Sequence, residues 1–285
     1  MPKLDRRQTL ALMAASTLGA CATPQEQAPD IASPPSPLFA HGVASGDPRA
    51  TSVVLWTRVT TDAADMAGTC QIARDNGFND IVAERSVTAF ADADHTVKFI
   101  PDGLTPGATY YYRFIFDGAV SPVGRTKTLP VGKLDKLGIA LISCSNYPFG
   151  YFNAYDAIAK DPDVDVVLHT GDYIYEYGAD GWGSETGTSI GRLHAPANEI
   201  LSLSDYRQRH AQYKTDAGSP AMHAAHPFIA SWDDHESANN PWIGGAANHQ
   251  PETEHATRRG ANRWTMANIT ARSPQRKRAM RSCGT

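Results

Sequence analysis

Two apolar segments on either side of an amphipathic one, between residues 137 and 169, constrain the fold of this chain most. Residues 137–143 (LGIALIS) and 164–169 (VDVVLH) are short, nearly continuous apolar runs, which are typical of strands buried on both faces. The intervening residues 150–160 have helical periodicity, which places four side chains on one face: Phe152, Tyr155, Ile158 and Ala159. The pattern predicts a β-α-β unit, and therefore a parallel sheet with a right-handed crossover.

Each of three successive apolar strands ends in residues able to bind a metal. The first is followed by residues 143–146 (SCSN), the second by 171–175 (GDYIY), and a third, at 227–232, by 233–236 (DDHE). Taken singly, the cysteine of the first segment would be interpreted as a small core residue and the aspartate of the second as a turn residue or helix cap. The third segment would be interpreted as a solvated loop. Ligands of open α/β sheets bind beyond the carboxyl ends of the strands. Three such ends together therefore favour a polynuclear metal site.

The residues before this unit have a different pattern. From residue 38 to 130 the chain consists of short β-type runs, which are separated by turn residues such as 75–77 (DNG) and 101–103 (PDG). That spacing predicts a small antiparallel sandwich. Residues 104–110 (LTPGATY) resemble the tyrosine corner of fibronectin type III domains, in which the hydroxyl of Tyr110 would bond back to the chain.

The first 21 residues have the features of an export signal. Arg6 and Arg7 precede an eleven-residue apolar run, residues 10–20, which is too short to span a membrane. The run ends in LGAC, which resembles a bacterial lipoprotein processing box in which Cys21 becomes a lipidated, membrane-attached N-terminus; simple cleavage near Ala20 or Ala22 is the alternative. Both predict export to the periplasm or cell envelope through the twin-arginine machinery. Residues 22–37, rich in Pro, Ser and Gln, read as a disordered linker.

Charge is distributed unevenly along the chain. Residues 255–285 contain eight Lys or Arg and no acid, so the net charge of −4 leaves −12 on residues 1–254. An acidic body argues against nucleic acid as a partner. The basic tail, 255–285, belongs to no periodic element and is predicted to be unstructured.

The ordered motifs of this chain resemble those of the PhoD-type alkaline phosphatases, which are relatives of the calcineurin-like metallophosphoesterases. The similarity runs from about Phe39 to about Glu254. It implies an α/β metallophosphoesterase-like domain at 131–254, incomplete at its C-terminus, preceded by a fibronectin III-like β-sandwich at 38–130. Six segments carry it: residues 39–48 (FAHGVASGDP), 53–58 (VVLWTR), 142–159 (ISCSNYPFGYFNAYDAIA), 168–178 (LHTGDYIYEYG), 206–213 (YRQRHAQY) and 232–242 (WDDHESANNPW).

The resemblance also implies a ligand set. Asp172 stands at the position of the bridging carboxylate, and Tyr175, three residues later, at that of a phenolate on ferric iron. The usual first Asp-x-His element is absent, and Cys144 stands where the family uses a thiolate on iron. Asp234 takes the place of a metal-binding Asn, and His235 that of the histidine facing the phosphate. The implied ions are Fe3+ and Ca2+, which suit the phenolate and the carboxylate oxygens respectively.

The function implied is that of an exported alkaline phosphatase or phosphodiesterase. A metal-activated hydroxide would attack small-molecule phosphate esters, and His235 would protonate or stabilise the leaving alkoxide. The family's later strand-end elements are not found after Glu254, so we expect a truncated chain whose activity is in doubt. The alternative is a non-catalytic exported binding module with a vestigial metal site.

Three other polar residues are less promising candidates. His169 ends an apolar strand, and we expect it to be a satisfied core histidine, or one that supports a ligand, rather than a ligand itself. Helical stretches are expected near residues 204–213 and 220–225. Arg207 and Arg209 lie in the first of them, and a solvated helical face is the preferred interpretation for both.

Overall fold

The computed structural model describes residues 36–242 and 245–248. The predicted signal peptide (1–21) with Cys21, most of the linker (22–37) and the basic tail (255–285) lie outside the described residues. Within the described part of the chain, no helix is long and apolar enough to cross a bilayer.

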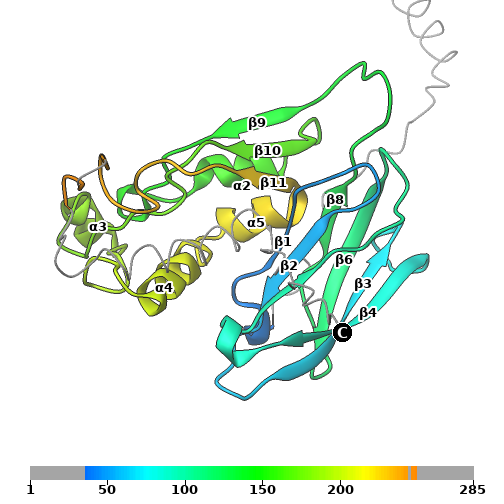
Figure 1. Ribbon diagram of the computed structural model, residues 1–285, viewed down its shortest axis with the longest axis horizontal. Coiled ribbons are helices and arrows are strands. Elements are labelled where there is room, and N and C mark those ends of the chain that lie inside the picture. Colours follow the sequence, from blue (N-terminus) through cyan, green and yellow to red (C-terminus); the bar gives the residue numbers. More distant parts are fainter. Residues whose placement is uncertain (1–35, 243–244, 249–285) are drawn as a thin grey trace, which may run out of the picture.

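The larger of two sheets contains the parallel strands predicted from the sequence (Figure 1). Residues on both sides of position 130 form this one sheet. Across the sheet, the first four strands run parallel to one another. The fifth strand is antiparallel to the fourth, and the sixth is antiparallel to the fifth. In sheet order they are β9 (Ile139–Ile142), β10 (Val166–His169), β11 (Pro227–Ala230), β1 (Val43–Gly46), β2 (Val54–Arg58) and β5 (Thr96–Phe99).

The smaller sheet is antiparallel and packs on the N-terminal strands of the first. A buried cluster that includes Phe39, Leu55, Phe114 and Phe116 lies between them. The backbone N–H of Thr105 donates to the hydroxyl of Tyr110 at 2.9 Å, so the predicted tyrosine bond is confirmed. The strands are β4 (Ile81–Ala89), β3 (Met66–Ala73), β6 (Thr109–Phe116) and β7 (Ala119–Val120), with β8 (Gly124–Lys127) also paired to β6.

The pairing of β1 with β11 was not expected from the sequence. Ser45 is opposite Pro227 and Gly46 is opposite Phe228 in a parallel register. Strands pair through backbone N–H and C=O groups, which nearly every residue carries. The side-chain pattern of residues 43–46 therefore does not identify the strand with which they pair. As a result the strands before residue 130 and those after it are hydrogen-bonded to one another.

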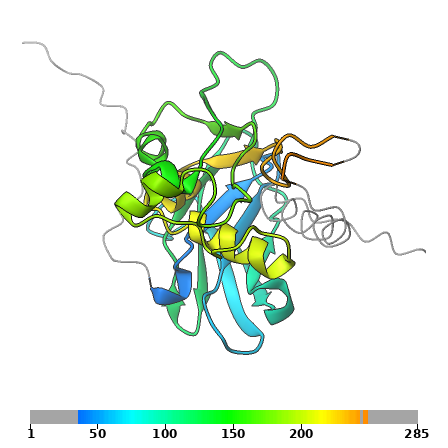
Figure 2. The ribbon, with the colours of Figure 1, turned by 90° about the vertical axis from the view of Figure 1, so that its left-hand side faces the viewer.

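Helices cover one face of the parallel strands. The predicted β-α-β unit is confirmed: α2 (Asn153–Ala159) connects β9 to β10, which pair in parallel. It packs beside α5 (Gly218–Ala225), and the two bury a cluster with Val167 and Phe228. Figure 2, viewed from the side of α3 (Ser184–Ile190) and α4 (Leu203–Tyr213), shows helices in front of the strands. Short 3-10 turns complete the elements: η1 (Pro37–Phe39), η2 (Ala91–Ala93) and η3 (Tyr147–Phe149).

The opposite face of β9, β10 and β11 carries an apolar row. The strand register places Leu141, Leu168 and Ile229 side by side. Leu141 is 65% exposed and Ile229 is 41% exposed. Because α2 and α5 pack on the other face, this row remains at the surface of the part of the chain that the structure describes.

Candidate metal centre

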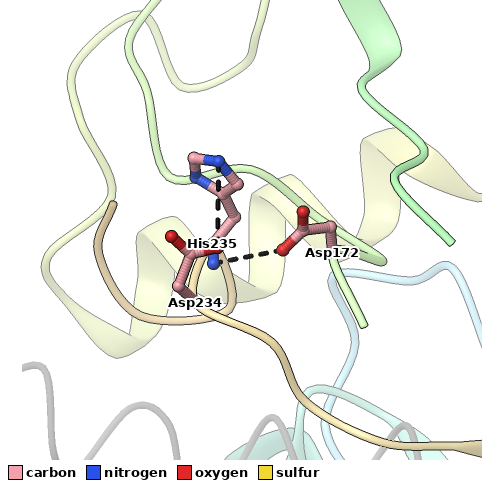
Figure 3. Close-up of side chains that lie close together, drawn as sticks. All are labelled: Asp172, Asp234 and His235. Carbon is pink, nitrogen blue, oxygen red and sulfur yellow. Dashed lines mark hydrogen bonds and ion pairs between the residues drawn. The ribbon is translucent and has the colours of Figure 1, made fainter. Parts of the chain in front are cut away.

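Three loops that follow the parallel strands meet at one edge of the sheet. Figure 3 shows Asp172, from the loop after β10, beside Asp234 and His235, from the loop after β11. A ligand atom from each of the three lies within 4.8 Å of the others. The backbone N–H of His235 donates to Asp172 Oδ1 at 3.3 Å, and His235 Nε2 lies 3.9 Å from Asp234 Oδ1. Two carboxylates and an imidazole this close together form a plausible cation site.

Cys144 and Tyr175 lie beside the other carboxylate oxygen of Asp172, and the ring centroid of Tyr175 also lies 4.3 Å from that of His235. The thiol of Cys144 is 3.5 Å from Asp172 Oδ2, and the hydroxyl of Tyr175 donates to the same oxygen at 3.3 Å. The other four residues singled out from the sequence are therefore gathered around the carboxylate of Asp172. Cys144 is exposed and forms no disulfide within the described residues, whereas Tyr175 is buried.

Burial shifts the pKa values of the ionisable groups in this cluster. Desolvation raises the pKa of Asp172, although His235 opposes the shift. Desolvation also raises the pKa of Tyr175 far above its usual value, and electrostatic interaction with Asp172 and Cys144 adds to the effect. The phenol therefore keeps its proton at neutral pH unless a cation displaces it.

The backbone at this edge is held in uncommon conformations. Cys144 and Asp172 have φ values of 58° and 56°, in the left-handed region that non-glycine residues rarely adopt. Gly171 has φ 121°, and a Cβ there would lie 2.4 Å from the backbone nitrogen of Asp233. The loops after β10 and β11 therefore approach each other more closely than any side chain at 171 would permit. Such strain occurs disproportionately at functional sites.

A buried carboxylate that the sequence analysis gave no role joins the same loops. Glu236 is fully buried and accepts three backbone hydrogen bonds, from Asp172 (3.1 Å), Tyr173 (2.5 Å) and Asp233 (2.8 Å). Desolvation raises the pKa of Glu236 even though these bonds favour its charged form. Glu236 thus sets the spacing between the loop of Asp172 and the loop of Asp234.

A second carboxylate without a predicted role orients His235. Glu176 is fully buried and lies 2.8 Å from His235 Nδ1. It also accepts from the backbone of Asn239 and the side chain of Asn248, both at 2.7 Å. Burial lowers the pKa of His235, but the hydrogen bond and charge of Glu176 outweigh it, and the net shift is upward. With Nδ1 directed at Glu176, the other ring nitrogen, Nε2, is on the side of Asp234.

Comparison with known proteins agrees with this geometry. Residues 24–130 match the model of the PhoD-like phosphatase N-terminal domain, and residues 139–272 match that of the PhoD-like phosphatase. The chain belongs to the PhoD-like phosphatase family. The second match continues to residue 272, past the limit near Glu254 that we expected from the sequence.

Two relatives show how much of a PhoD-like protein this chain represents. Alkaline phosphatase D of Bacillus subtilis (strain 168) is 43% identical over 242 residues, which are 81% of this chain and 40% of that protein. A solved structure described as PhoD superposes with a TM-score of 0.74 at 39% identity, covering 86% of this chain and 48% of that one. The chain therefore spans less than half the length of these PhoD-like relatives.

The structure corrects one expectation about the basic residues of α4. Arg209 was expected on a solvated helical face, but it is fully buried. Its guanidinium donates to the carbonyls of Tyr175, Ala195 (3.0 Å) and Pro196 (3.2 Å). A buried cation is tolerated where its donors are satisfied, and here it connects the PhoD-like Gly-Asp-x-x-Tyr segment to the loop before α4. Arg207 donates to the carbonyl of Asp92 at 2.6 Å.

His169 occupies the core position that was expected. It is fully buried, and its Nε2 lies 3.1 Å from the hydroxyl of Tyr155 and 3.3 Å from that of Ser145. Desolvation lowers the pKa of His169 to about 4, so the ring is neutral at physiological pH. Through its contact with Ser145, His169 supports the loop that contains Cys144.

Proposed function

We propose that this chain carries a metal centre for the hydrolysis of small-molecule phosphate esters, as an alkaline phosphatase or phosphodiesterase. The observation that carries the proposal is the convergence of Cys144, Asp172, Tyr175 and Asp234 beside His235. The activity is proposed rather than transferred, because the chain spans 40% of alkaline phosphatase D.

The donor set suits a mixed centre of Fe3+ and Ca2+. The phenol of Tyr175 and the thiol of Cys144 both face Asp172 Oδ2, and such anionic donors favour ferric iron. Asp172 Oδ1 is directed toward the loop of Asp234, whose carboxylate is a hard oxygen donor suited to calcium. Asp172 would be the carboxylate shared between the two ions. Bound ions of this kind activate water and neutralise charge on phosphoryl oxygens.

His235 is the proposed catalytic residue among the protein's own groups. Glu176 accepts a hydrogen bond from Nδ1, so the ring is held in one orientation. Nε2 then remains available to donate a hydrogen bond or a proton to the leaving-group oxygen. No covalent phospho-enzyme is needed, and neither Ser143 nor Ser145 has a role as nucleophile.

The test is metal analysis of the purified protein together with hydrolysis of p-nitrophenyl phosphate at alkaline pH. We expect bound iron and calcium, turnover that EDTA removes and that added metal restores, and loss of both iron and turnover in Cys144→Ala. Cys70→Ala is the matched control, because Cys70 is buried in the sandwich core. Absence of both metal and turnover would instead support a non-catalytic exported module with a vestigial site.

The domain assignment is part of the same proposal. Residues 131–254 would be the N-terminal part of an α/β metallophosphoesterase-like domain, and residues 38–130 a fibronectin III-like sandwich whose strand β1 continues the sheet of that domain. The β9-α2-β10 unit supports the first, and the antiparallel sheet with its Tyr110 bond supports the second. An experimental structure that pairs the strands differently would refute the assignment.

We also propose export to the periplasm or cell envelope by the twin-arginine machinery, followed by either lipidation at Cys21 or simple cleavage near Ala20 or Ala22. Changing Arg6 and Arg7 together to Lys should leave the protein in the cytoplasm as an unprocessed precursor, because the machinery reads the arginine pair. Cell fractionation with immunoblotting measures this. The same double change at Arg258 and Arg259 is the control and should leave export intact. Equal export of both variants would contradict the proposal.

A further inference from the structure

An exposed aromatic surface lies directly beside the proposed catalytic histidine. Trp182, in the loop before α3, is 56% exposed, and Phe149, in η3, is 46% exposed. Their ring centroids are 4.8 Å apart in an edge-to-face arrangement. The indole of Trp182 also stacks on the ring of His235, at 6.3 Å and an interplanar angle of 20°. An exposed pair of aromatic rings, arranged edge to face, therefore lies next to His235.

The loop around Trp182 is built by close contacts that hold the indole in place. A Cβ at Gly181 would lie 2.6 Å from the Cβ of Tyr177, and one at Gly183 would lie 3.1 Å from the ring of Phe149. Gly183 also has φ 97°, a conformation that favours glycine. The carbonyl of Trp182 accepts from the side chain of Asn146 at 3.5 Å. The two flanking glycines thus allow the tryptophan to pack against Phe149 on one side and Tyr177 on the other.

A large aromatic side chain that is ordered and still exposed is typical of a binding surface. In the described part of the chain, Trp182 contacts His235, Tyr175, Tyr177 and Phe149, so its buried edge belongs to the metal centre. Its remaining surface has no polar group except the indole N–H. Such a surface favours a planar ring through stacking and discriminates little between small alkyl groups.

We propose that Trp182, supported by Phe149, is a specificity-determining residue that stacks against the leaving group of the ester. The preferred substrate class is phosphate esters whose leaving group carries a planar aromatic ring, in preference to small alkyl phosphates. This inference rests on the proposed function, because it assigns the substrate class of the same site.

The test compares the binding of two non-hydrolysable ligands, phenylphosphonate and methylphosphonate, to the metal-loaded full chain by calorimetry. We expect phenylphosphonate to bind about 10-fold more tightly, in line with the strength of aromatic stacking. Trp182→Ala should bring the ratio of the two dissociation constants close to one. Trp182→Phe should restore part of the preference, which a purely structural role would not do.

Phe90→Ala provides a matched control, because Phe90 is 49% exposed and follows β4 in the N-terminal sandwich. It should leave the ratio unchanged. If methylphosphonate binds and the ratio in Trp182→Ala equals that of the wild type, the inference is overturned and the proposed function survives. If neither phosphonate binds the metal-loaded protein, both are overturned.

Discussion

Under the proposed function, replacing Asp172 with Asn should abolish phosphate ester hydrolysis and prevent metal binding. Asn keeps the shape of the side chain and one oxygen, but it loses the negative charge that Cys144, Tyr175 and the His235 backbone surround. Loss of an outer partner of a metal ligand already costs 10- to 100-fold in affinity or activity. For a carboxylate shared by two cations we expect kcat/KM to fall by at least about 1000-fold, which corresponds to about 4 kcal/mol.

The measurement is kcat/KM for p-nitrophenyl phosphate together with the iron and calcium content of each variant. Asp180→Asn makes the same chemical change at an exposed carboxylate near the site, and it should alter neither quantity. A variant of Asp172 that retained its iron and full turnover would show that the centre does not depend on this carboxylate.

The second large effect is on stability, at Glu236. Its side chain accepts hydrogen bonds from three backbone N–H groups of two different loops. Glu236→Ala would leave these buried donors without a partner and open a cavity, so the free energy of unfolding should fall by about 3–5 kcal/mol. Glu236→Gln retains one acceptor oxygen, and its loss should be smaller.

Urea unfolding followed by circular dichroism measures both variants. Glu84→Ala removes an exposed carboxylate on β4 and should change the free energy of unfolding by no more than about 0.5 kcal/mol. If Glu236→Ala unfolded at the same urea midpoint as the Glu84 variant, Glu236 would not be what holds the two loops together.

The candidate site could be predicted from the sequence because its members occur at the ends of recognisable strands. The apolar runs that became β9, β10 and β11 each stop just before or within a few residues of Cys144, Asp172 or Asp234. Parallel strands place their carboxyl ends at one edge, so the side chains had to converge there. The observed strands are shorter than the apolar runs, because β9 and β10 begin two residues after their runs do, and β9 and β11 end before theirs.

Glu176 and Glu236 were missed although both lie within the quoted motifs. Each follows a residue with an assigned role, and nothing in the local pattern separates a buried acceptor from a solvated acid. One signal was available for Glu176, which stands between two tyrosines in an otherwise apolar segment, where an unpaired acid is rarely buried. That signal predicts a paired carboxylate, but it does not identify His235 as the partner.

The sequence by itself determined the β-α-β unit, the third strand, the helix at α4 and the linear order of the PhoD-like motifs. These depend on apolar continuity and helical periodicity, which are properties of neighbouring residues. Only the tertiary structure decided that β1 pairs with β11, that Arg209 is buried and that Trp182 stacks on His235. Each of these depends on backbone groups, carbonyls or rings that are distant along the chain. The bond from the Asp172 backbone to Glu236, 64 positions away, is such a contact, and local pattern does not encode it.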